Sequence, residues 1–156
     1  MYYLHAIYEY VFDAKFDGAS KSSRLMQSLI YLVEELGVNP GEYGFDLSPC
    51  GVYSFNLCTD VGKKNQAKLQ DVKLNEYTRS KLDVIKSLVA LNHKPDWLNY
   101  VAVAHFTRKY VAPTRYTKSQ VCDTAENRCP NLTDRILIEQ ACEVAFEIYN
   151  WVSPKR

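Results

Sequence analysis

The stretch Ser20–Gly37, with the sequence SKSSRLMQSLIYLVEELG, decides the fold. Its apolar residues recur every three or four positions, which predicts an amphipathic α-helix. The inward face of this helix consists of Leu25, Leu29, Leu32, Val33 and Leu36. Ser20 or Ser22 can cap the start of the helix, and Gly37 ends it. Because such a helix buries its apolar stripe against other elements, the rest of the chain must supply partners for it.

Helical spacing recurs on both sides of this stretch, in segments that follow typical helix-starting residues. Ser54, Thr78, Asp96 and Thr133 each precede an apolar periodic segment, so we predict them to be N-caps. The further predicted helices cover residues 2–13, 55–61, 79–91, 97–110, 118–128 and 134–151. The sequence therefore predicts a mainly α fold with six to seven helices.

A small β element is expected beside the helices. Residues 43–47 alternate like a short strand, and Pro49-Cys50-Gly51 then turns the chain. Residues 68–74 are ambiguous between a strand and a ragged helical turn. No internal repeat, low-complexity tract or linker divides the sequence, so residues 1–156 are predicted to form one compact domain.

The composition is that of an ordinary globular protein, with 47% apolar and 24% charged residues and a net charge of +1. This net charge argues against a strongly electrostatic nucleic-acid binder. Residues 61–118 nevertheless carry 12 basic and 4 acidic side chains, a net charge of +8. No signal peptide and no apolar run of the ~18 residues needed for a membrane span is present, so we expect a cytoplasmic protein without a membrane contact.

The basic middle third contains the best candidate for a binding site. The candidate binding residues are Lys63, Lys64, Lys68, Lys73, Arg79 and Lys81. If residues 68–74 form a strand, the lysines lie on a loop before it, where a winged helix contacts the phosphates of DNA. A solvated surface is the alternative. Lysines alone do not read base sequence, which requires Arg, Asn or Gln at the base edges.

No pattern of catalytic or metal-binding residues is recognisable, so we predict a non-enzymatic protein without a cofactor or metal. His5, His93 and His105 fall in three different elements, and His105 is expected at the edge of the core. Glu34 and Glu35 point in different directions on a helix and are expected at the solvated surface. A thiol nucleophile stays an alternative, but no CxxC pair occurs among the cysteines, which are Cys50, Cys58, Cys122, Cys129 and Cys142.

Four short segments resemble the YwgA-like proteins and their Panacea (SocA-like) relatives. They are Arg24–Leu32, Pro49–Ser54, Trp97–Tyr110 and Arg128–Thr133, in the same order as in that family. The motif positions that match are Gln27, Tyr31, Gly51, Tyr53 and Ser54. Ser28 and Val52 stand where the family usually has Lys and Pro, so no role is carried over to them.

The resemblance implies a helical domain with a winged-helix-like half over residues 2–76, followed by C-terminal helices over 77–152. It also implies an antitoxin-like, phage-related or defence-related regulatory protein that recognises a protein partner. The alternative is a nucleic-acid binder that uses the lysine-rich loop, and self-association into a homo-oligomer stays open. We expect structural roles for the matching motif: Gly51 in a tight turn, Ser54 as a cap, and Tyr31 and Tyr53 packing helix against turn.

Overall fold

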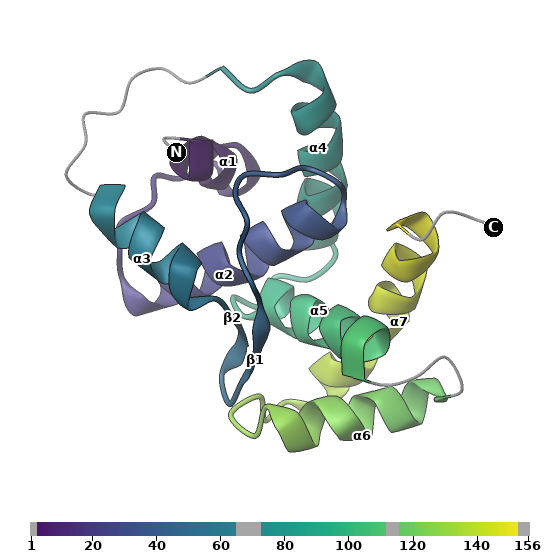
Figure 1. The fold of residues 1–156 in the computed structure, drawn as a ribbon. Helices are drawn as coiled ribbons and strands as arrows, with labels where there is room; N and C mark the ends of the chain where they lie inside the picture. Colours follow the sequence, from purple (N-terminus) through teal and green to yellow (C-terminus); the bar gives the residue numbers. More distant parts are fainter. Residues whose placement is uncertain (1–2, 65–72, 112–115, 153–156) are drawn as a thin grey trace. The chain divides into compact units, whose positions relative to one another are not determined.

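The computed structural model describes residues 3–64, 73–111 and 116–152, and this part of the chain is mainly helical (Figure 1). The mainly α prediction is therefore confirmed. The described helices are α1 (Tyr3–Phe12), α2 (Ser20–Glu35), α3 (Phe55–Lys64), α4 (Glu76–Ala90), α5 (Trp97–Phe106), α6 (Lys118–Arg128) and α7 (Arg135–Val152). A π-helical turn, η1 (Thr107–Val111), continues α5, and one hairpin joins β1 (Asp46–Ser48) to β2 (Gly51–Tyr53).

The chain forms two compact units, and each is built from two separate segments. The first unit contains Met1–Phe45 and Ser54–His93, and the second contains Asp46–Tyr53 and Lys94–Arg156. The hairpin thus belongs to the second unit, although in the sequence it lies between the two segments of the first unit. Helix α4 belongs to the first unit, whereas the predicted halves divide the chain at residues 76 and 77. The single-domain prediction stays a prediction.

In the first unit, helix α2 contacts α1, α3 and α4. The predicted inward residues Leu29, Leu32 and Val33 are buried, while Leu25 and Leu36 are only half-buried. Every residue from Met26 to Val33 is buried, which is a wider surface than one helical stripe. The reason is that other helices cover α2 on more than one side, so side chains outside the periodic face are also removed from water.

In the second unit, helix α5 is buried over its whole length, from Trp97 to Phe106. It packs against α6, α7 and β2. His105, expected at the edge of the core, is fully buried within it. The side chain of Thr107 donates a hydrogen bond to the carbonyl of Val103 (2.7 Å), at the point where α5 gives way to η1.

Three helices begin with a different cap from the one predicted. The observed cap lies upstream of the predicted one for α2 (Ala19) and α4 (Asn75), and one residue downstream of Thr133 for α7 (Asp134). The predicted Ser20, Ser22 and Thr78 lie inside the first turn, where the backbone is already helical. By contrast, the predicted cap Ser54 is confirmed, since its hydroxyl accepts a hydrogen bond from the amide of Leu57 (3.2 Å).

The hairpin is shifted from its predicted position. Its strands pair antiparallel with Asp46 opposite Tyr53 and Ser48 opposite Gly51, so the predicted strand over 43–47 is three residues too early. Gly51 has a φ of +136°, which only glycine adopts readily, and this lets pairing resume directly after the turn. A second strand over 68–74 falls mainly on residues outside the described ranges; Lys73 and Leu74 form no strand.

Candidate functional site

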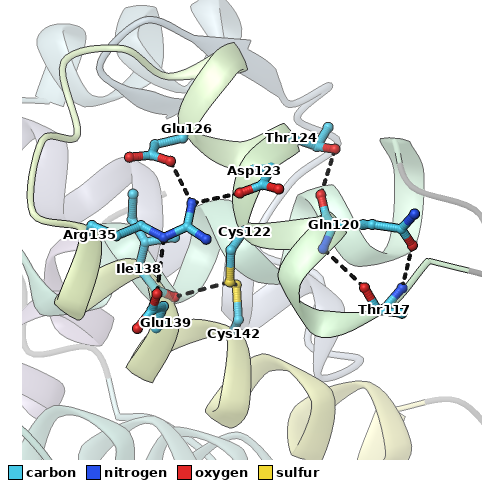
Figure 2. A network of polar contacts seen from close by, with 10 residues as sticks. All are labelled: Thr117, Gln120, Cys122, Asp123, Thr124, Glu126, Arg135, Ile138, Glu139 and Cys142. Carbon is cyan, nitrogen blue, oxygen red and sulfur yellow. Dashed lines mark hydrogen bonds and ion pairs between the residues drawn. The ribbon is translucent and has the colours of Figure 1, made fainter.

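The side chain of Arg135 joins helices α6 and α7 at the surface of the second unit (Figure 2). Its guanidinium contacts Asp123 (2.8 Å) and Glu126 (2.5 Å) on α6, and Glu139 (3.1 Å) one turn along α7. The three carboxylates raise the pKa of Arg135 above its ordinary value. All four side chains are at least one-third exposed, so water screens the network.

Two buried thiols lie beside this network. The Sγ atoms of Cys122 on α6 and Cys142 on α7 are 2.6 Å apart, and the two side chains point toward each other (Figure 2). The Cys122 thiol also approaches the carbonyl of Ile138 (3.9 Å). Both residues line a cavity of about 240 Å³, whose wall also includes Arg135 and Glu139.

Cations and aromatic rings contact one another on η1, at the start of α6 and within α7. We call this cluster the basic aromatic face, and it consists of Arg108, Lys109, Tyr110, Lys118 and Phe146. Arg108 and Lys118 both lie over the ring of Phe146, at 4.8 and 5.5 Å, and Lys109 lies over Tyr110 at 5.3 Å. The ring of Tyr110 packs against that of Phe106 at a tilt of 45°, and Tyr110 is 54% exposed. Lys109, Tyr110 and Lys118 present positive charge and aromatic surface together, whereas Nε and Nη1 of Arg108 are buried.

In the first unit, the side chain of Gln27 holds the backbone of Ser54. The amide of Ser54 donates to Oε1 of Gln27 (2.8 Å), and Nε2 of Gln27 donates to the Ser54 carbonyl (3.1 Å). Both residues are buried. Two residues of the resembling motif thus form one bidentate contact that fixes the start of α3, in agreement with the structural role expected of them.

Glu34 lines an open hollow of about 500 Å³ that also includes Gly37, Val38 and Tyr43. Its carboxylate accepts a hydrogen bond from the amide of Tyr43 (3.4 Å). Partial burial, and to a smaller extent the charge of Glu35, raise the pKa of Glu34 to about 7. Glu34 is thus half-buried and not fully solvated as predicted, because the segment after α2 packs beside it.

The predicted lysine-rich site is described only in part. The side chains of Lys63 and Lys64, and the whole of Lys68, lie outside the described residues. Lys73 and Arg79 are exposed, and Arg79 borders a hollow of about 350 Å³ beside Tyr10. Lys81 is half-buried and lies 5.5 Å from the centre of the Tyr77 ring. The described members point to no common ligand, so this site stays a prediction.

The other motif residues have separate structural environments. Tyr31 is buried and meets the ring of Phe45 edge-on at 5.5 Å, so it packs α2 against the segment that leads to β1. Tyr53 ends β2 and is 41% exposed. Gly51 lies directly against the side chain of Asn99, which donates a hydrogen bond to the carbonyl of Cys50 (2.7 Å). Any larger residue at position 51 would collide with Asn99.

The cysteine pair and the basic aromatic face were not among the predicted sites. Both depend on side chains that come from different helices, so no local spacing shows them. The one usable signal for the pair is helical spacing. Cys122 lies three residues before Ala125, and Cys142 three residues before Ala145, so each cysteine shares the inward side of a predicted helix with a small apolar residue. For the face, the signal is the absence of acidic residues between Asp96 and Asp123.

Comparison with known proteins gives no assignment. No protein-family model matches the chain, and neither the curated proteins nor the solved structures contain a match. The resemblance to the YwgA-like and Panacea proteins, with the regulatory context that it implies, therefore stays a prediction. Among the described residues, no helix is long and apolar enough to cross a membrane, and no three His, Cys, Asp or Glu side chains gather as metal ligands.

Proposed function

We propose that this protein is a non-enzymatic binding protein that recognises an acidic segment of another protein. The contact is made by the basic aromatic face of the second unit. The observation that carries the proposal is the stacking of three cations on two aromatic rings: Arg108 and Lys118 over Phe146, and Lys109 over Tyr110. Such pairs are attractive because the face of an aromatic ring carries negative electrostatic potential.

Charge supports an acidic partner. From Trp97 to Cys122 the sequence contains no Asp or Glu, whereas it contains four Lys or Arg residues. A positive surface steers a negatively charged partner toward itself and disfavours basic ones. One acidic side chain does reach the face, since Glu143 of α7 pairs with Lys118 at 2.7 Å. We assign Lys109 to the partner because it is exposed on η1, whereas Nε and Nη1 of Arg108 are buried.

Side-chain type supports a protein partner. Tyr and Arg are enriched at protein–protein interfaces, and Tyr is frequent among the residues that contribute most to binding. A cation that already rests on a ring has fewer conformations to lose when the partner binds, which lowers the entropic cost of association. The exposed Tyr110 adds apolar area next to the charge. An acidic peptide with an apolar anchor matches both properties.

A nucleic-acid partner fits these features less well. Non-specific nucleic-acid binding depends on many phosphate contacts, each of which releases a counterion. The chain has a net charge of only +1, and Glu143 already neutralises Lys118. The lysine-rich segment of the first unit would have to supply the remaining phosphate contacts. This alternative becomes an outcome of the experiment below.

The test is co-purification from the source cell with tagged wild-type protein and two variants. K109E/Y110S reverses one charge and removes the exposed ring of the face. K73E is the matched control, because Lys73 is an exposed lysine in the other unit. We expect at least one protein partner whose recovery falls about 10-fold or more with K109E/Y110S, which corresponds to ~1.4 kcal/mol, and is unchanged with K73E.

Binding of a labelled single-stranded oligonucleotide, measured at several salt concentrations, separates the alternatives. The proposal predicts weak binding that K109E/Y110S hardly changes. Tight, steeply salt-dependent binding that K109E/Y110S abolishes would assign the face to nucleic acid instead. Loss with K73E alone would support the lysine-rich site. Equal recovery of every protein by wild type and K109E/Y110S would overturn the assignment of the face.

A further inference from the structure

We propose that Cys122 and Cys142 form a redox-active pair, which a peroxide oxidises to a disulfide that joins α6 to α7. The sulfur atoms lie 2.6 Å apart. Carbon atoms that are not bonded to each other rest at ~3.5–4 Å, so this contact is closer than ordinary packing. It is only about 0.5 Å longer than a disulfide bond.

The geometry requires little movement for the bond to form. Figure 2 shows the side chains of Cys122 and Cys142 pointing toward each other from α6 and α7, with their sulfurs side by side. These two helices pack directly against each other. A disulfide between positions whose side chains point apart would need a backbone shift, whereas here a small approach of the two sulfurs suffices.

The surroundings give the two sulfurs different roles. The Cys142 thiol can donate a hydrogen bond to a thiolate at Cys122, and Arg135 adds positive charge, so the pKa of Cys122 is lowered. The same contact and burial raise the pKa of Cys142. Because the thiolate is the reactive form, Cys122 is the sulfur that attacks the peroxide. Cys142 is the resolving thiol, positioned to complete the disulfide.

Access comes from the cavity beside the pair. The side chains of Cys122 and Cys142 are only 3% and 1% exposed. Both nevertheless border the cavity of about 240 Å³, together with Lys118, Ser119 and Arg135. A peroxide is small and polar, so it can enter the cavity. The hydroxyl and cationic groups of the wall can form hydrogen bonds with it as it approaches the sulfur.

The reaction balances with hydrogen peroxide as the oxidant. The Cys122 thiolate attacks one peroxide oxygen, the O–O bond breaks, and hydroxide leaves and takes up the proton released from Cys122, which yields water and a sulfenic acid at Cys122. The sulfur of Cys142 then attacks that of Cys122, the S–O bond breaks, and the leaving hydroxide takes the proton of Cys142 to give a second water. Two electrons pass from the two sulfurs to the peroxide, and the product is the disulfide.

The remaining cysteines lie in different environments. Burial raises the pKa of Cys129 to about 11, which keeps it as an unreactive thiol. Cys50 and Cys58 are exposed, and Cys58 belongs to the other unit. Exposed thiols react with any reagent in solution, so they provide an internal reference for simple accessibility. The proposal predicts that the buried pair forms a disulfide in preference to them.

The experiment treats the full-length protein with a small excess of hydrogen peroxide, alkylates the remaining thiols under denaturing conditions, and maps the peptides by mass spectrometry. We expect a linked peptide that joins Cys122 to Cys142, an intact mass lower by two hydrogen atoms, and full reversal by dithiothreitol. The oxidised protein should also have a Tm several degrees higher, because the new bond restricts the unfolded chain. The wild-type peptide map is decisive even if a variant fails to fold.

Two variants assign the order of events. In C142S, a sulfenic acid at Cys122 should be trapped by dimedone, because no resolving thiol is present. In C122S, Cys142 should remain fully alkylated after peroxide treatment. C58S is the matched control and should still form the linked peptide. The proposal is overturned if peroxide leaves both thiols free to alkylate while Cys58 is oxidised, or if it produces sulfinic acid at Cys122 without a linked peptide in the wild type.

Discussion

Two polar contacts hold helices in place, one in each unit, and they differ in burial and in charge. In the first unit, Gln27 holds the backbone of Ser54 with two neutral hydrogen bonds, and both residues are buried. In the second unit, Arg135 binds three carboxylates that are at least one-third exposed. The second contact has more bonds and full charges. Burial nevertheless decides how much each contact contributes to stability. Water readily replaces an exposed ion pair, but it does not reach a buried amide.

The largest expected effect comes from Gln27→Met, which keeps the length and volume of the side chain but removes its hydrogen-bonding groups. The amide of Ser54 would then be buried without its partner, at ~1–3 kcal/mol, whereas the Ser54 carbonyl keeps the hydrogen bond from the amide of Cys58 (3.1 Å). We expect the free energy of unfolding to fall by roughly 1–3 kcal/mol, measured by urea denaturation. Gln140→Met, at an exposed position of α7, is the matched control and should change stability by less than about 0.5 kcal/mol.

A loss below about 1 kcal/mol for Gln27→Met would contradict the claim that the buried contact contributes strongly to stability. It would mean that water enters the site when Gln27 is removed. A variant that is too unstable to purify supports the prediction only if Gln27→Glu or Gln27→Asn recovers part of the stability. Both replacements keep an acceptor oxygen that the Ser54 amide can use, although at a different charge or length.

The sequence predicts the helices of this fold well because their evidence is periodic and local. The burial of Leu29 and Leu32 follows directly from their spacing. The contact between Gln27 and Ser54 has no such signal, because one side chain meets the backbone of a residue 27 positions away. Resemblance to a family pointed to both residues, but only the structure shows that they meet.

The basic aromatic face likewise could not be predicted from local sequence alone. Counting charges identified residues 61–118 as basic, and the basic aromatic face begins within that range. The prediction nevertheless centred on the lysines around Lys63–Lys73, because charge alone does not tell which cations lie beside an aromatic ring. Phe146, which receives Arg108 and Lys118, comes from a helix much later in the chain. Partners of this kind depend on tertiary packing.

Glu34 is intermediate between the two contacts, because it is an ionisable group that is only partly buried. Its pKa is raised from 4.5 to about 7, so the folded protein holds the proton more tightly than the unfolded chain does. This contribution to stability is fully present below about pH 4.5, and it is lost as the pH rises through 7. Glu34→Gln mimics the protonated form and can still accept the hydrogen bond from Tyr43.

We therefore expect Glu34→Gln to be more stable than the wild type at pH 8, by about 1 kcal/mol once solvent screening at this half-exposed site is allowed for. The two proteins should have the same stability near pH 4. Urea denaturation across this pH range measures the difference. Glu42→Gln, at an exposed position in the wall of the same hollow, is the control and should not reproduce the pH dependence. A constant gap between Glu34→Gln and the wild type at all pH values would show that Glu34 is solvated.

The smallest effect should come from Arg135→Met, the same replacement residue as at Gln27 but at the exposed ionic contact. Removing the guanidinium leaves Asp123, Glu126 and Glu139 near one another, so a small loss of Tm is expected at low salt from their repulsion. In about 1 M NaCl the Debye length falls to ~3 Å, and the difference from the wild type should nearly vanish. Calorimetry at both salt concentrations tests this, with Lys94→Met as the control at an exposed position of the same unit. A Tm loss that equals that of Gln27→Met and persists in high salt would show that α6 and α7 depend on the ion pairs as strongly as α3 depends on Gln27, and the distinction by burial would fail.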